Sequence, residues 1–226
     1  GTCDYKQTLT RTVTVNQLPT MTSSANPAAI CSGDAVGLTL ISDLASTYSW
    51  SAASNGSVGG ETTSASSANP INDVLTNTTT SSQNVVYTVI PTSTVGSCVG
   101  ASQTVTVTVN PAPAMTSVNS ATICSGETVS IPLTSGVASS YSWVAANNGN
   151  TTGESTSSQS GTHLSNTITN NSTSSQDVVY TVTPTSIVGS CAGSGQTVTV
   201  TVDPAPTMTS STTQTICSGN AVNISL

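Results

Sequence analysis

The chain has 226 residues, of which 5% are charged and 3% aromatic, and its formal net charge is −7 at pH 7. Lys6 and Arg11 are its two cations, so the sequence offers no basic surface for phosphate groups. We therefore exclude nucleic acid and anionic membrane surfaces as partners. No stretch approaches the roughly 18 apolar residues of a membrane-spanning helix, so we expect no membrane insertion in this segment.

A tetrapeptide, Ile-Cys-Ser-Gly, occurs at 30–33, 123–126 and 216–219, at an interval of 93 residues both times. A second cysteine, at Cys98 and Cys191, keeps the same interval. Such self-similarity is the signature of tandem modules. We divide the chain into the C-terminal strand of a preceding module (1–18), two complete modules (19–111 and 112–204) and the first strands of a following module (205–226). We accordingly expect a window of a longer secreted chain.

Residues 7–16 alternate threonine with apolar residues, and 103–110 and 196–203 repeat the pattern. This period of two predicts the last β-strand of a module. Prolines follow each copy, at Pro19, Pro111 and Pro204. They predict short, stiff linkers between modules.

Within a module the strands follow in order. A short strand after Met115 leads to the Cys-Ser-Gly turn, and the next strand carries Val129, Ile131 and Leu133 on one face. The third strand carries Tyr141 and Trp143, whose spacing directs both rings to one side. A Gly-, Asn- and Ser-rich stretch follows at 147–161, and the corresponding stretch of the first module is 54–70.

Two further strands are predicted at 164–170 and 177–184, before a last hairpin leads into the terminal strand. Six or seven short strands without a helical pattern predict an all-β fold of tandem immunoglobulin-like β-sandwich modules in a linear array. Phe is absent, so the remaining aromatic residues must form most of the aromatic core. We assign to it Trp50, Trp143, Tyr48, Tyr141, Tyr87 and Tyr180.

The six cysteines form no CxxC pair, and His163 is the sole histidine, which favours disulfides over zinc. Disulfides place the chain in an oxidising, extracellular compartment. In sandwich order, one cysteine of each module lies at the end that faces the next module and the other at the opposite end. We therefore predict an inter-module bridge from Cys31 to Cys191.

Two alternative bridges stay open, because pairing within a module is the commoner arrangement. They join Cys31 to Cys98, and Cys124 to Cys191. If the inter-module bridge forms, the remaining cysteines await partners in modules outside this window. These are Cys3, Cys98, Cys124 and Cys217.

Reaction chemistry is not indicated, and we predict no enzyme and no cofactor. His163 stands where the other module has Pro70, so it cannot serve a function common to both. The acids are dispersed, and no D-x-D-x-D cluster is present to bind calcium. A calcium site would have to form from acids that are distant in sequence and meet near Glu127 or Asp34. Trp50 and Trp143 could stack on sugars, but their place in a repeated strand favours the core.

The ordered set of motifs carries a resemblance. Ile-Cys-Ser-Gly, Tyr-Ser-Trp, Val-Val-Tyr-Thr-Val-x-Pro, Gly-Ser-Cys and the Thr-Val-Thr-Val-Asn-Pro ending resemble the PKD-like and immunoglobulin-like tandem repeats of giant Bacteroidetes surface adhesins. These include gliding-motility adhesins and other cargo of type IX secretion. The resemblance implies an array on the bacterial cell surface that extends a functional tip. The Trp-Asp-Phe-Gly-Asp run of true PKD domains is missing, since Val144 follows Trp143.

Three functions are compatible with these observations. The first is a structural stalk or filament of a bacterial surface adhesin, because a spacer needs near-identical modules. Its partners would be neighbouring modules, with identical chains beside it in a filament. The second is an array that binds polysaccharide or a host surface through the variable stretch 147–161. The third is a set of accessory domains of a larger secreted enzyme.

Overall fold

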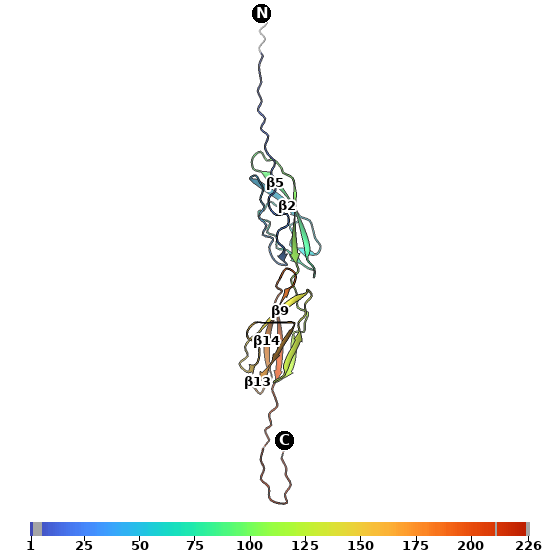
Figure 1. Cartoon of the computed structure of the whole chain (residues 1–226), viewed down its shortest axis with the longest axis vertical. Helices are drawn as coiled ribbons and strands as arrows, with labels where there is room; N and C mark the ends of the chain where they lie inside the picture. The colour runs from blue at the N-terminus through green and yellow to red at the C-terminus, as the bar shows by residue number, and fades with distance from the viewer. Residues whose placement is uncertain (2–5, 211, 225–226) are drawn as a thin grey trace. The chain divides into compact units, whose positions relative to one another are not determined.

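The computed structural model describes residues 1, 6–210 and 212–224, and all their regular structure is β-strand. The chain divides into two compact units, Gly1–Ala112 and Pro113–Leu226 (Figure 1). This confirms the predicted fold class of tandem β-sandwich modules. Each unit is described by itself.

The second unit is built around a five-stranded sheet. Its strand order is β11-β9-β14-β15-β7, and β7 runs parallel to β15 while the other pairs are antiparallel. The facing layer contains the pair β12-β8 and the short pair β10-β13. The bounds are β7 (Ser120–Cys124), β8 (Thr128–Pro132), β9 (Ser139–Ala145), β10 (Thr151–Thr152), β11 (Gln159–Ser160), β12 (His163–Thr167), β13 (Thr169–Asn170), β14 (Gln176–Ser186) and β15 (Gln196–Asp203).

The first unit repeats this plan with fewer regular strands. Its main sheet has the order β1-β6-β5-β2, and β3 pairs with β4. Isolated bridges, Ala35 to Val74 and Leu38 to Ile71, stand where the second unit has the β8-β12 ladder. The bounds are β1 (Ile30–Cys31), β2 (Ser46–Ala52), β3 (Val58–Gly59), β4 (Thr76–Asn77), β5 (Gln83–Ser93) and β6 (Gln103–Asn110).

Alternation along the long strands produces the cores. In β14, Val178, Tyr180 and Val182 are fully buried, whereas their neighbours in sequence face outward. Burying β-branched residues from two layers stabilises such a sandwich, at about 25 cal/mol per Å² of apolar surface. Each unit therefore has a closed core of its own, drawn from its own strands.

The aromatic residues assigned to the core fall into two groups. Trp50, Trp143, Tyr87 and Tyr180 are buried, and in the first unit the rings of Trp50 and Tyr87 meet edge to face with centroids 5.7 Å apart. Tyr48 and Tyr141 are only partly buried and pack against the edge of the core. Each of these two contacts a serine hydroxyl through its own hydroxyl, Ser42 at 3.0 Å and Ser135 at 2.9 Å.

The two terminal segments differ from expectation. No strand forms over residues 6–18, although their pattern predicts one, and none forms over the described residues between 205 and 224. A β-strand requires a neighbour for its backbone hydrogen bonds, and the neighbours predicted for these segments belong to further modules.

Candidate functional site at the ends of the modules

The two cysteines of each module lie at opposite ends of its main sheet. In the second unit, Cys124 ends β7 and pairs in register with Asp203, the last residue of β15. Cys191 lies in the hairpin between β14 and β15, where its carbonyl accepts a hydrogen bond from the backbone of Ser186 at 2.9 Å. We call the end with Cys124 the trailing end, because the chain leaves the sheet there at Asp203. We call the end with Cys191 the leading end, because the chain enters the module there, where the Pro113 carbonyl lies beside Gly193.

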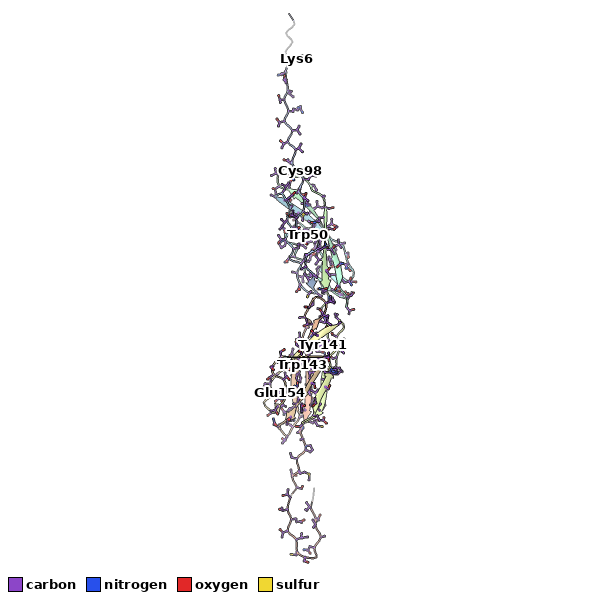
Figure 2. All side chains as sticks on the ribbon, viewed as in Figure 1. Lys6, Trp50, Cys98, Tyr141, Trp143 and Glu154 are labelled. Atoms are coloured by element: carbon purple, nitrogen blue, oxygen red, sulfur yellow. The ribbon has the colours of Figure 1, made fainter. Side chains whose placement is uncertain are left out.

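The first unit has the same arrangement. Cys31 pairs in register with Asn110 at the trailing end, and Cys98 lies beside Ser93 at the leading end. Figure 2 shows Cys98 at the end of the unit where the N-terminal segment joins it. The opposite placement that strand order predicted is thus present in both units.

The length of the central strand separates the two cysteines of one module. β5 and β14 each have 11 residues and run from the trailing to the leading end. At about 3.3 Å per residue this spans roughly 33 Å or more. A disulfide requires Cα atoms within about 7 Å, so the cysteines of one module cannot be joined.

The state of the cysteines agrees with this geometry. Cys31 and Cys191 are disulfide-bonded, whereas Cys98, Cys124 and Cys217 are free; Cys3 lies outside the described residues. The two alternative bridges, Cys31 to Cys98 and Cys124 to Cys191, are therefore wrong. The reason is the strand length that separates each pair.

A network of hydrogen bonds within the trailing end holds the Cys-Ser-Gly turn of the second unit. The Ser125 backbone donates to the Asp203 carbonyl at 2.8 Å, and the Gly126 backbone donates to the Ile168 carbonyl at 2.8 Å. Gly126 has a φ of 88°, a conformation that favours glycine. The Glu127 carboxylate accepts from the Cys124 backbone at 3.0 Å, which fixes the cysteine at the rim of the sheet.

A buried asparagine fastens this turn to the sheet. The Ser125 hydroxyl accepts a hydrogen bond from the Asn170 backbone at 3.0 Å. The Asn170 side-chain amide donates to the carbonyls of Ser174 and Val202, both at 2.8 Å. Its oxygen accepts from the Ser172 backbone at 2.8 Å. Asn77 makes the equivalent bonds in the first unit, to Ser81, Val109, Thr79 and Ser32.

A buried serine organises the leading end. The Ser186 hydroxyl accepts from the Cys191 backbone at 3.0 Å and donates to the Val188 carbonyl at 2.8 Å. Ser190, directly before the cysteine, has a φ of 52°, in the left-handed region. The first unit repeats this hairpin with Ser93, Ser97 and Cys98. Both cysteine positions are thus set by backbone structure that is the same in the two modules.

Sequence reasoning missed these two supporting residue types. Asn170 is the last residue of one predicted strand and Ser186 lies just beyond another, yet both polar side chains are buried. One signal was present: each recurs at the interval of the cysteines, as Asn77 and Ser93. A polar residue repeated in register with a cysteine is a candidate for its support.

The carboxylates of both units bind backbone and hydroxyl groups. Every acid among the described residues accepts a hydrogen bond from such a group. Within the same part of the chain, no three side chains of the types His, Cys, Asp and Glu lie close enough together to hold a metal ion. The groups proposed for calcium, around Asp34 and Glu127, instead receive the backbone N–H of Cys31 and Cys124. The acids are Asp34, Asp43, Glu61, Asp73, Glu127, Glu154, Asp177 and Asp203.

The partner of the core tyrosine differs between the modules. Tyr87 donates to the Asp73 carboxylate at 2.9 Å, and burial together with this carboxylate raises the pKa of Tyr87. Asn166 replaces the aspartate in the second unit, where the Tyr180 hydroxyl has no protein partner. Burial, with a smaller contribution from Glu154, raises the pKa of Tyr180 to about 12. Both phenols therefore stay neutral at ordinary pH and act as core residues.

His163 is exposed on β12, with its Nδ1 atom 3.2 Å from the Thr162 hydroxyl. The indole N–H of Trp50 donates to the Ala68 carbonyl at 2.7 Å, and both tryptophans face the core. Neither ring is therefore presented to a sugar.

Within the described part of the chain, no helix is long and apolar enough to cross a membrane.

The architecture defines a class: tandem antiparallel β-sandwich modules of immunoglobulin-like type. A family model for the PKD-like domain matches residues 28–113 and 121–206, and the chain therefore belongs to the PKD-like domain family. The matched domains are of a non-catalytic kind. Because disulfides persist in oxidising compartments, bonded cysteines in such domains indicate an extracellular location.

Several solved structures are similar to this chain. A chimeric titin Z1Z2-Z1Z2 tandem is 14% identical and covers 83% of this chain and 100% of that chain, with a TM-score of 0.27. The titin I-band fragment I67-I69 is 8% identical over 84% and 66% of the two chains, with a TM-score of 0.38. Mouse cadherin-23 EC22-24 is 11% identical over 83% and 64%, with a TM-score of 0.31. No curated protein matches the chain by sequence.

Proposed function

We propose that this chain is part of a structural stalk or filament of a bacterial extracellular surface adhesin. In this stalk, successive modules are joined by a disulfide as well as by the polypeptide. The observation that carries the proposal is the bonding state of the cysteines: Cys31 and Cys191 are bonded, while their counterparts Cys124 and Cys98 are free. A binding or catalytic role would not require covalent bonds at module ends.

Counting supports the pairing of Cys31 with Cys191. Cys98, Cys124 and Cys217 are free, so Cys3 would be the sole other candidate. Cys3 can form one disulfide only. If it were bonded to Cys31, Cys191 would have no partner, and if it were bonded to Cys191, Cys31 would have none. A bridge between Cys31 and Cys191 satisfies both.

Chain connectivity supports the same pairing. Cys31 pairs in register with Asn110, and the Pro113 carbonyl lies against Gly193, two residues after Cys191. The linker from Asn110 to Pro113 spans three peptide units, at most about 11 Å. A linker of this length permits the pairing that we propose between Cys31 and Cys191.

The function under load follows from this arrangement. A proline linker limits bending, and a second covalent link beside it removes the remaining freedom of a hinge. Force applied along the array then passes through the disulfide as well as through the terminal strand β6. A stalk that holds a tip away from the cell needs this stiffness, and near-identical modules supply it by repetition.

Reduction is expected to loosen the joint without unfolding the modules. Spin labels placed by non-canonical amino acids at the exposed residues Thr104 and Thr197 would report the distance between the units by pulsed EPR. We expect the distance distribution to broaden after reduction, and a C31S/C191S variant to show the same broad distribution when oxidised. The melting transition of each module should change far less.

The matched control is a C98S/C124S variant, which keeps the proposed bridge and should retain the narrow distribution. An unchanged width after reduction, with both modules destabilised, would contradict the stalk proposal. That result would mean that the disulfide serves folding and not the joint.

A further inference from the structure

The leading end of the first unit has an open hollow beside a free cysteine. It has a volume of about 210 Å³ and is lined by Asn16, Gln17, Leu44, Ala45, Ser93 and Val95. Ser93 also receives the Cys98 backbone N–H through its hydroxyl, so the Cys98 residue is held at the margin of this hollow. Val95, in the same hairpin, is 71% exposed, although an aliphatic side chain gains from burial.

The trailing end of the second unit has complementary features. Cys124 is exposed and free, and Ser125 and Gly126 follow it in a small turn. A Cβ atom built on Gly126 would meet nothing within 4 Å, so this side of the turn is open. The Glu127 carboxylate beside the turn already accepts a hydrogen bond from the Cys124 backbone. A hollow with neutral polar and apolar walls suits such a turn.

We propose that the hollow is the seat for the Cys-Ser-Gly turn of a preceding module, and that Cys98 forms a disulfide with the cysteine of that turn. Cys124 offers the same turn to the module that follows. The inference rests on the proposed stalk, and it adds that the array extends in both directions by one repeated joint. A second copy of this chain can represent either neighbour.

The internal repeat supplies the independent observation. Cys98 is the counterpart of Cys191, and Cys124 is the counterpart of Cys31; both counterparts are disulfide-bonded. The hairpin around Cys98 has the same hydrogen bonds and the same left-handed serine as the hairpin around Cys191. The two free thiols are therefore placed by the same local structures that place the bonded pair.

The bond forms by ordinary thiol–disulfide exchange with a disulfide oxidant such as glutathione disulfide. The thiolate of Cys124 attacks one glutathione sulfur and releases one glutathione thiol. The thiolate of Cys98 then attacks the Cys124 sulfur of this mixed disulfide and releases the second. Two protein thiols are oxidised, and one glutathione disulfide is reduced to two glutathione molecules.

Complementation between two variants tests the joint. In a chain that carries C3S and C217S, the C98S variant retains the turn with Cys124, and the C124S variant retains the hollow with Cys98. Incubated with glutathione disulfide, the mixture should form a covalent dimer, and each variant alone should stay monomeric on a non-reducing gel. Mass spectrometry should find Cys98 of one chain joined to Cys124 of the other.

A filled hollow provides the second arm. Adding A45W to the C124S chain places an indole in the hollow and should slow dimer formation by about tenfold or more, since close packing tolerates no such insertion. The control, T104W, adds the same ring on the exposed face of β6 and should leave the rate unchanged. Both variants should keep the spectrum of the folded chain.

Either of two results would overturn the inference. The first is formation of Cys124-to-Cys124 dimers by the C98S variant as readily as by the mixture, which would show only that an exposed thiol oxidises. The second is the absence of a dimer in the mixture while the single chain still contains the Cys31-to-Cys191 bridge. The second result would leave the proposed stalk joint intact and remove only its extension to further modules.

Discussion

Replacing Asn170 with alanine is expected to lower the free energy of unfolding of the second unit by about 3 to 4 kcal/mol. The substitution removes two hydrogen bonds donated by the side-chain amide and those accepted by its oxygen. The Val202 carbonyl would stay buried without a partner, and a buried unsatisfied group costs about 1 to 3 kcal/mol. The tie of the Cys-Ser-Gly turn to β13 should remain, because the Ser125 hydroxyl accepts from the backbone N–H of residue 170.

Hydrogen exchange resolved by mass spectrometry can measure this effect unit by unit. Protection should fall in β14 and β15 of the second unit and stay unchanged in β5 and β6 of the first. Asn171 provides the matched control, because it is the next residue and has an exposed side chain. Asn171→Ala should leave protection unchanged. Equal effects of the two substitutions would mean that the buried side-chain amide of Asn170 does not stabilise the second unit.

Replacing Gly153 with alanine should destabilise the second unit by about 3 kcal/mol or more, because two costs act at once. Its φ is 97°, which costs an L-residue about 1 to 2 kcal/mol. A Cβ atom there would also lie 2.0 Å from the Thr167 carbonyl oxygen, so the backbone at the end of β12 must move. Gly60 has the same environment in the first unit, beside the Val74 carbonyl.

Chemical denaturation followed by circular dichroism would measure this change. Gly149→Ala is the control, since a Cβ atom at Gly149 meets nothing within 4 Å and its φ is not positive. We expect the control to shift the unfolding midpoint little. If Gly153→Ala were as mild as the control, the end of β12 would be free to move, and the close approach of the Thr167 carbonyl would not constrain residue 153.

The sequence was sufficient for the fold because its periodicities agree. Alternation in 176–186 and 196–203 predicts two long strands, and their in-register pairing confirms the pattern. The exact repeat shows that each module carries its two cysteines at fixed positions, and the strand order places these positions at the module ends. From strand order alone, Cys124 and Cys191 were expected at opposite ends of one sheet, and the structure places them so.

Other features required three dimensions. Asn170 and Ser186 lie in polar stretches, and only the folded chain shows that their amide and hydroxyl replace missing backbone partners. Alternation over 7–16 predicted a strand, but a strand forms only where a neighbour supplies hydrogen bonds. The hollow beside Cys98 is also invisible in sequence, because its walls come from segments far apart in the chain.

Peptide mapping under non-reducing conditions tests the central claim, a bridge from Cys31 to Cys191, most directly. The chain has three glutamates, Glu61, Glu127 and Glu154, so cleavage after Glu gives the fragments 1–61, 62–127, 128–154 and 155–226. In a C3S/C217S chain whose free thiols are alkylated first, we predict one disulfide-linked species that joins 1–61 to 155–226. A species that joins 62–127 to either of those fragments would contradict the stalk joint.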